Sequence, residues 1–367
     1  MPSDASAPVV IVGAGQAGLS VAYYLRSSGL VAGRDFVIFD RGPQPGGAWQ
    51  HRWPALKLGT AHRVNDLPGL TDLGLSFENA DRARPASEVV TEYYRRYEQH
   101  FELAVVRPVA VSRVGTRGPD LVVDTTSALY GDHRTTTQIL VNATGTWGAP
   151  FRPHYAGAET FRGRQLHTSD YRTADEFAGQ NVVVIGGGTS AIGFLLELEP
   201  VASHLAWATR RPVEWSDSES LDLEAAVAAV AAQDAAARAG RQLPSIVSGT
   251  KVPMNERIRN GIKRGVLADR PMFTRIEPTG VRWADGSFSP ADALLWATGF
   301  RPEVRHLSAL RLREAAGGLR VQEGASVADP RIFFAGYGPQ ASTIGAARAA
   351  RRTARAILER LPALRTR

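Results

Sequence analysis

Short apolar runs alternate with helical patterns along this chain, and the alternation predicts an α/β fold. The first run, residues 8–12, is apolar and β-branched, as is typical of a buried parallel strand. A helical pattern of apolar residues follows over 19–25, and residues 36–39 predict the next strand. This strand–helix–strand order is that of a nucleotide-binding unit.

A glycine-rich turn joins the first strand to the helix and reads GAGQAG over residues 13–18. Its first glycine allows a tight turn, its second lets backbone approach a pyrophosphate, and its third lets helix and sheet pack closely. The pyrophosphate would lie at the helix N-terminus, where free N–H groups favour negative charge. An acid that binds ribose hydroxyls is expected about 20 residues further on, and Asp40 follows Gly18 by 22 residues. The predicted dinucleotide contacts are Gly13, Gly15, Gln16, Ala17, Gly18 and Asp40.

The same order of elements returns later in the chain. Residues 182–185 are an apolar run, GGGTSA over 186–191 has the form G-x-G-x-x-A, and a strand is predicted over 204–209. This unit ends in two arginines rather than an acid, and arginines pair with a ribose 2′-phosphate that a carboxylate would repel. The alternative for these arginines is a solvated pair at a strand end. The predicted NADP contacts are Gly186, Gly188, Thr189, Ser190, Arg210 and Arg211.

Two further strands end in the tripeptide Ala-Thr-Gly, at residues 143–145 and 297–299. Small residues after a strand let backbone or a ligand approach closely. Candidate cofactor contacts here are Thr144, Gly145, Thr298 and Gly299.

These patterns predict two Rossmann-like dinucleotide-binding domains, one inserted into the other. The first comprises residues 1–155 and 286–367, and the second comprises 156–285. An alanine-rich helical stretch over 221–239 is interpreted as a cap or lid on the second domain.

Composition narrows the possible chemistry. The 367 residues are 44% hydrophobic and 22% charged, which is ordinary for a globular protein and excludes a disordered chain. The absence of cysteine excludes a disulfide framework, a CxxC redox pair and a thiolate metal site. No acidic spacing suggests a metal site. No apolar run approaches 18 residues and the N-terminal residues lack an apolar signal core, so we expect a cytoplasmic protein without a membrane partner.

The net charge of +7 favours an anionic partner. The arginines are spread along the chain rather than clustered, so we expect phosphate-bearing small molecules and no nucleic acid. Two dinucleotide sites in one chain indicate FAD on the first and NADPH on the second, with hydride passing from nicotinamide to flavin. The oligomeric state stays open, and a homodimer would not be surprising.

Three motifs resemble those of a known family, the flavin-containing monooxygenases among the class B flavoprotein monooxygenases. Residues 161–171 read FRGRQLHTSDY, which resembles the identifying motif F-x-G-x-x-x-H-x-x-x-Y of that family. GGAW over 46–49 resembles its flavin-facing stretch, and ATGF over 297–300 resembles its ATG-aromatic motif. The resemblance covers nearly the whole chain and looks closest to the short soluble bacterial members.

The resemblance implies an activity. NADPH would reduce FAD, and the reduced flavin would take up O2 to give a C4a-hydroperoxyflavin. One oxygen atom would pass to a small-molecule substrate, either a soft nucleophile such as a sulfide or amine, or a ketone in Baeyer–Villiger fashion. No catalytic side chain is identified. The resemblance adds cofactor contacts at Gly47, Trp49, Val109, Thr343 and Ile344. His51, beside Trp49, is a further candidate for a hydrogen bond to FAD, and the alternative is a histidine that only packs in the loop.

Some points stay open at this level. Many family members hold an asparagine near the flavin where residues 56–62 here read LKLGTAH, and Thr60 is the candidate substitute. His167 of the identifying motif acts either as an acid or base or as a fixed point of the domain crossing. The main alternative function is an NAD(P)H reductase or oxidase that oxygenates nothing, and a non-catalytic flavoprotein is a further one.

Overall fold

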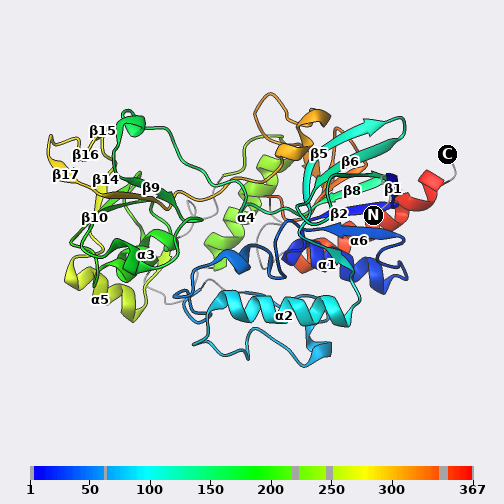
Figure 1. Cartoon of the computed structure of the whole chain (residues 1–367), viewed down its shortest axis with the longest axis horizontal. Coiled ribbons are helices and arrows are strands. Elements are labelled where there is room, and N and C mark those ends of the chain that lie inside the picture. The colour runs from blue at the N-terminus through cyan, green and yellow to red at the C-terminus, as the bar shows by residue number, and fades with distance from the viewer. Residues whose placement is uncertain (1–3, 62–63, 217–222, 245–250, 339–345, 366–367) are drawn as a thin grey trace. The chain divides into compact units, whose positions relative to one another are not determined.

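Each of two structural units in this chain is organised around a parallel β-sheet. The computed structural model describes residues 4–61, 64–216, 223–244, 251–338 and 346–365 (Figure 1). Unit 1 comprises Met1–Gly148, Val230–Pro244 and Pro302–Arg367, and unit 2 comprises Ala149–Ala229 and Ser245–Arg301.

Unit 1 contains a seven-stranded sheet of order β19-β20-β21-β8-β2-β3-β4, parallel from β21 to β4 and antiparallel at β19 and β20. Its strands are β2 (Val9–Val12), β3 (Phe36–Phe39), β4 (Val105–Val106), β8 (Ile139–Asn142), β19 (Val321–Gln322), β20 (Ala325–Ser326) and β21 (Ile332–Phe334). A second sheet of order β1-β7-β6-β5 is formed by β1 (Asp4–Ser6), β5 (Ala110–Arg117), β6 (Asp120–Thr126) and β7 (His133–Thr137).

The helices of unit 1 are α1 (Gln16–Ser27), α2 (Ala86–His100) and α6 (Ala346–Arg365), with short 3-10 turns η1 (Gly47–His51), η2 (Leu70–Leu73) and η6 (Arg305–Leu310). Alternate residues of β2 point to opposite faces of the sheet, so Val9 and Ile11 pack in one core and Val10 and Val12 in the other. Helices α1 and α6 pack against each other over the first of these cores (Figure 1). The buried strand β2 thereby fixes the position of the turn that follows it.

Unit 2 repeats this plan with a five-stranded parallel sheet of order β14-β11-β10-β18-β9. Its strands are β9 (Arg164–His167), β10 (Asn181–Ile185), β11 (His204–Thr209), β14 (Asp269–Pro271) and β18 (Ala293–Trp296). Smaller sheets pair β12 (Trp215–Ser216) with β13 (Val252–Pro253), and β15 (Arg275–Glu277) with β16 (Gly280–Arg282) and β17 (Phe288–Pro290). Its helical elements are α3 (Thr189–Leu198), α5 (Glu256–Arg264), η3 (Ala158–Thr160) and η4 (Ala174–Phe177).

The units differ from the expected domain limits at three places. Unit 2 begins at Ala149 instead of at residue 156. Strand β18 pairs with β10 and β9, so unit 2 ends only at Arg301 instead of at residue 285. The alanine-rich stretch is helix α4 (Leu223–Arg238), and its residues from Val230 onward belong to unit 1. Ala237 explains this grouping, because it is buried in the same core as Val10. The stretch is therefore not simply a lid on the second domain.

Among the described residues, no helix has the length and apolar character needed to cross a bilayer.

Candidate functional site

The first glycine loop, residues 13–18, leads from β2 into α1 and needs glycine at its first and last positions. A Cβ on Gly13, whose φ is +103°, would lie 2.5 Å from the carbonyl oxygen of Ala143. A Cβ on Gly18 would lie 1.9 Å from the carbonyl oxygen of Gly13. The middle glycine, Gly15, meets only the Cα of Gly47 at 3.8 Å, so its surroundings leave room for a ligand.

The glycine pair at residues 46 and 47 packs against this loop. Gly47 has φ +53°, and a Cβ on it would lie 2.7 Å from the Cα of Gly15. The turn η1 that begins there places Trp49 in the apolar core of unit 1 and ends at His51. The structure thus brings the expected flavin-facing stretch to the second glycine of the loop.

Asp40 follows β3, is 7% exposed and fastens the first glycine loop. Its Oδ2 accepts the N–H of Ala14 at 2.7 Å, and its Oδ1 accepts the N–H of Gly42 at 2.8 Å. Each carboxylate oxygen has two acceptor positions, so both retain one for a ribose hydroxyl. Asp40 therefore supports the loop and keeps the capacity to bind ribose.

A buried ion pair lies beside Asp40. Arg107 donates two hydrogen bonds to Glu98 of α2, at 2.6 and 2.8 Å, and its Nε lies 3.9 Å from Oδ1 of Asp40. Burial raises the pKa of the Glu98 carboxyl, while the guanidinium of Arg107 opposes that shift. Val109 precedes β5 and donates its N–H to the carbonyl oxygen of Asp40 at 2.8 Å. An adenine contact at Val109 would therefore have to use its carbonyl.

The second glycine loop, residues 186–191, joins β10 to α3. A Cβ on Gly186, whose φ is +133°, would lie 2.3 Å from the carbonyl oxygen of Ala297. Among the residues that the structure describes, no carboxylate accepts an N–H of this loop; instead the indole N–H of Trp207 in β11 donates to the carbonyl oxygen of Gly186 at 2.7 Å. Ala191 stands at the position of the third glycine.

Both loop helices begin without a side-chain cap. The N-cap residues of α1 and α3 are Gly15 and Gly188, and neither helix has an acidic residue in its first turn. Helix α5, by contrast, is capped by Asn255, whose side chain accepts the N–H of Ile258. The first N–H groups of α1 and α3 thus have no side-chain cap, and this is the arrangement that binds phosphate.

At the end of β11, a threonine occupies the position that Asp40 has in unit 1. Register places Thr209 where unit 1 has Asp40, since β2 and β3 pair Val12 with Phe39 while β10 and β11 pair Ile185 with Ala208. The Thr209 hydroxyl donates to Asp269 at 2.7 Å. Arg210 and Arg211 follow this strand, and both are exposed. Within the described ranges, neither side chain makes a hydrogen bond or an ion pair. Thr189 and Ser190 open the helix beside them.

The two Ala-Thr-Gly turns make the same pair of hydrogen bonds. Thr144 Oγ1 donates to the carbonyl oxygen of Glu303 at 2.6 Å, and the Glu303 N–H donates to the carbonyl oxygen of Gly145 at 2.9 Å. In unit 2, Thr298 Oγ1 donates to the carbonyl oxygen of Phe151, whose N–H donates to that of Gly299 at 3.0 Å. These turns therefore hold neighbouring chain segments in addition to backing the glycine loops.

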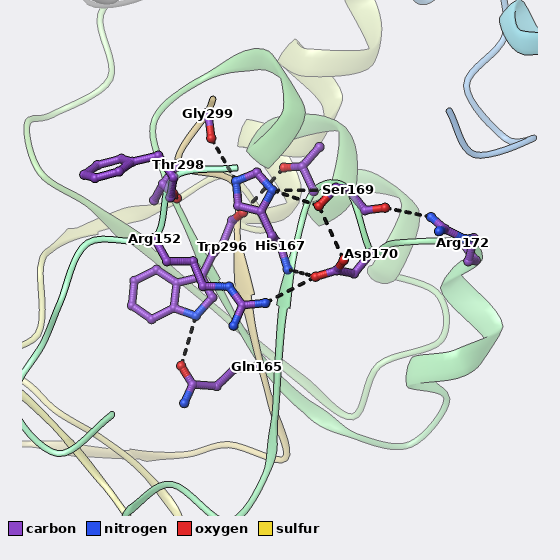
Figure 2. Close-up of polar contacts among 11 residues, drawn as sticks. Arg152, Gln165, His167, Ser169, Asp170, Arg172, Trp296, Thr298 and Gly299 are labelled. Atoms are coloured by element: carbon purple, nitrogen blue, oxygen red, sulfur yellow. Dashed lines mark hydrogen bonds and ion pairs between the residues drawn. The ribbon is translucent and has the colours of Figure 1, made fainter. Parts of the chain in front are cut away.

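His167 of the identifying motif lies at the end of β9 and is 1% exposed (Figure 2). Its Nε2 lies 2.9 Å from the carbonyl oxygen of Gly299, and its Nδ1 lies 3.3 Å from the N–H of Ser169. A neutral ring with the proton on Nε2 satisfies both contacts. Burial lowers the pKa of His167, which favours that neutral form. These contacts support the interpretation of His167 as a positioning residue.

Asp170 and Arg152 complete this cluster (Figure 2). Asp170 accepts the backbone N–H of His167 at 2.8 Å and the guanidinium of Arg152 at 3.2 Å. The segment after β9 is thereby fixed to the turn that carries Gly299.

Three residues of the sequence prediction stand apart from those above: Thr343, Ile344 and Thr60. Thr343 and Ile344 fall outside the described residues. Thr60 is exposed, and its hydroxyl donates to the carbonyl oxygen of Lys57 at 3.1 Å. Gly336 meets the first helical turn through Ala17, since a Cβ on it would lie 3.3 Å from that side chain. Within the described ranges, no group of three His, Cys, Asp or Glu side chains is placed to hold a metal.

Sequence reasoning missed the residues that fasten the loops from a distance. Trp207 carries a weak signal, because a tryptophan inside a buried strand needs a partner for its N–H. Arg107 and the backbone of Glu303 carry none, because their contacts depend on tertiary structure.

The chain is similar to a known oxidoreductase family and to solved flavin monooxygenases. Residues 10–336 match the family model described as pyridine nucleotide-disulphide oxidoreductase. A flavin-containing monooxygenase from Stenotrophomonas maltophilia is 32% identical, with a TM-score of 0.78 over 97% of this chain and 99% of that one. A double mutant of a flavin monooxygenase from the same organism is 34% identical, with a TM-score of 0.79 over 96% and 98%. An indole-3-pyruvate monooxygenase, YUCCA4, from Oryza sativa subsp. japonica is 26% identical over 80% of this chain and 74% of that protein.

Proposed function

This chain belongs to the pyridine nucleotide-disulphide oxidoreductase family and, within it, to the class B flavoprotein monooxygenases, and from this premise we propose an NADPH-dependent FAD monooxygenase. It transfers one oxygen atom of O2 to a sulfide or amine, or inserts it into a ketone. The observation that carries the proposal is a pair of glycine loops, each followed by a helix without a side-chain cap. The charged residues beside the two loops have opposite signs. Asp40 accompanies the first loop, and Arg210 and Arg211 accompany the second.

FAD fits unit 1. The open side of Gly15 and the N-terminus of α1, whose N-cap residue provides no side-chain cap, accept a pyrophosphate, and Asp40 retains acceptor positions for the adenosine ribose. Ala143 and Thr144 of the first Ala-Thr-Gly turn, with Gly47, lie beside the loop. Unit 1 is accordingly the FAD-binding domain of this proposal.

NADPH fits unit 2. The N-terminus of α3 accepts the pyrophosphate, and the two exposed arginines after β11 pair with the ribose 2′-phosphate. Thr209 stands in the place of the acid that would repel this phosphate. Unit 2 is accordingly the NADPH-binding domain.

When bound, FAD accepts hydride from NADPH and supplies the reaction with O2. The chain binds, orients and shields these groups. Trp49, Trp53 and Leu58 follow the Gly47 turn and are 8%, 3% and 7% exposed. Apolar side chains of this kind would help to exclude water from a flavin bound beside them. The hydroxyl of Thr60 is bonded to Lys57, so we do not assign it the role of the asparagine found in many relatives.

Double mixing tests the proposal on the purified yellow protein. NADPH first reduces it without oxygen, and aerated buffer is then added while absorbance is followed. We expect a transient species before the oxidised flavin spectrum returns, and its faster decay with a sulfide, an amine or a ketone. NADPH consumption should equal oxygenated product. Consumption equal to hydrogen peroxide, with no response to any such compound, would instead establish the oxidase.

A further inference from the structure

Arg52 carries a positive charge that forms no ion pair with any acidic side chain in the described residues. It follows the turn η1, whose first residue Gly47 touches Gly15 of the first glycine loop. Its Nε is buried and has no hydrogen-bond partner. Within the described part of the chain, its guanidinium makes no hydrogen bond or ion pair at all.

The guanidinium of Arg52 lies over two indole rings. The Cζ of Arg52 lies 4.4 Å from the ring centre of Trp147 and 5.7 Å from that of Trp49. The ring of His51 is stacked on Trp147, with 6.0 Å between centres and 7° between planes. Cation–π contacts occupy the faces and leave the N–H groups at the edge unused.

Another arginine of unit 1, Arg107, differs from Arg52 in having an acidic partner. Arg107 is 13% exposed along its side chain and makes two hydrogen bonds to Glu98. Arg52 has no such partner, and burial lowers its pKa to about 10, so it remains charged at neutral pH. Cation–π contacts return less free energy than the burial of an unpaired charge costs. A site of this kind gains its counter-charge from a ligand.

We propose that Arg52 binds a planar, delocalised anion beside the first glycine loop. The guanidinium fork matches an anion that presents two acceptor atoms on one edge. A substrate carboxylate has such an edge, and so has the N1–C2–O edge of a reduced flavin. If the anion is the reduced flavin, the proposal rests on the proposed function. If the anion is a substrate carboxylate, it does not.

Three variants of the full chain test this binding role. Arg52→Met removes the charge and keeps the length, and Arg52→Lys keeps the charge without the fork. Arg360→Met is the matched control, because Arg360 also lies over an aromatic ring of unit 1, 4.8 Å from the centre of Phe333. Thermal unfolding of each variant shows first whether it is folded.

The flavin source is measured as the two-electron potential of bound FAD. Loss of a cation that stabilises the reduced form should weaken its binding relative to oxidised FAD about tenfold, which is about 30 mV of potential. Arg52→Met should show this shift, Arg52→Lys less of it, and Arg360→Met none.

The carboxylate source is measured by titrating the flavin spectrum with phenylacetate and with phenylacetamide. Arg52→Met should weaken phenylacetate binding at least tenfold and leave the amide unchanged. Both measurements remain valid if no oxygenated product is ever formed, so failure of the proposed function is seen separately. A change in either quantity supports the proposal and identifies the anion. A folded Arg52→Met variant with unchanged potential and unchanged phenylacetate binding would overturn it, and would leave Arg52 as a contact between two tryptophans.

Discussion

The two glycine loops share a backbone frame but are fastened by different side chains. Each first glycine donates its N–H to the neighbouring strand, Gly13 to Phe39 and Gly186 to Ala208, at 2.7 and 2.9 Å. In unit 1 the fastening group is a carboxylate that accepts an N–H, that of Asp40. In unit 2 it is an indole that donates to a carbonyl, that of Trp207.

This difference separates support of the loop from charge at the ribose. In unit 1 Asp40 supports the loop and is also the residue that we propose for the ribose. In unit 2 Trp207 supports the loop from within β11, so the position after the strand is free to carry a positive charge. A loop of one backbone shape can thereby be matched to a ribose with or without a 2′-phosphate.

The largest expected effect concerns the third position of each loop, where unit 1 has Gly18 and unit 2 has Ala191. In Gly18→Ala the new Cβ would overlap the carbonyl oxygen of Gly13, at 1.9 Å, and a backbone atom cannot move aside cheaply. We expect a loss of at least about 3 kcal/mol of unfolding free energy and of bound FAD. Urea unfolding and flavin content measure these changes.

The control for this substitution is Gly193→Ala in α3, where a new Cβ meets nothing within 4 Å. It should keep its flavin and gain stability, because alanine favours a helix over glycine. A Gly18→Ala variant that retains FAD would show that the two third positions are equivalent.

The buried histidines of the two units extend the comparison to pH. His167 has partners at both nitrogens, whereas His306 of unit 1 has a buried Nε2 without one. Burial, with the nearby charge of Arg41, lowers the pKa of His306 to about 4. Between pH 6.5 and 4 the unfolded chain takes up a proton that the folded chain does not, so the free energy of unfolding falls as pH falls.

The loss reaches about 3 kcal/mol below pH 4. His306→Gln should remove this part of the pH dependence when unfolding is measured between pH 7.5 and 4. His100→Gln, at an exposed position of α2, should leave the profile unchanged. Parallel profiles for the wild type and His306→Gln would show that folding does not lower the pKa of His306.

The exposed arginines test the charge at the second loop. Loss of one charge-assisted contact to the 2′-phosphate costs about 1.5–3 kcal/mol, which is roughly 10- to 150-fold in affinity. Arg210→Ala and Arg211→Ala should lower the NADPH-to-NADH ratio of kcat/KM within that range. Arg275→Ala, whose arginine pairs with Glu277 in the same unit, is the control. If both loop variants keep the wild-type ratio, the arginines are a solvated pair.

The local parts of both loops could be predicted from the sequence, because strand, glycine spacing and helix are neighbours along the chain. Gly13 and Asp40 lie where the pattern placed them, at the ends of adjacent strands. Trp207 could not be assigned its role, since its partner Gly186 becomes a neighbour only when β10 and β11 pair. Unit 2 ends at Arg301, later than the predicted residue 285, for a similar reason, because the partners of β18 are not readable from its own residues.

The smallest expected effect concerns the two Ala-Thr-Gly turns. Loss of the threonine hydroxyl should cost more unfolding free energy in one turn than in the other. Thr144 Oγ1 contacts two groups, the carbonyl oxygen of Glu303 and the side chain of Asn142, which is 4% exposed. Thr298 Oγ1 donates to Phe151 alone, and His167 provides additional support for that turn through Gly299. Valine keeps the shape of threonine and removes the hydroxyl, so Thr144→Val leaves two groups without a partner.

A lost hydrogen bond of this kind costs about 1 kcal/mol, so Thr144→Val should cost about 2 kcal/mol and Thr298→Val about 1 kcal/mol in urea unfolding. Thr144→Ser and Thr298→Ser keep the hydroxyl and should stay near the wild type. Equal costs for the two valine variants would mean that Asn142 finds another partner, and the turns would then be equivalent in energy as well as in hydrogen-bond pattern. A larger cost at Thr298 would contradict the supporting role given to His167, because a turn with a second attachment should be the less sensitive of the two.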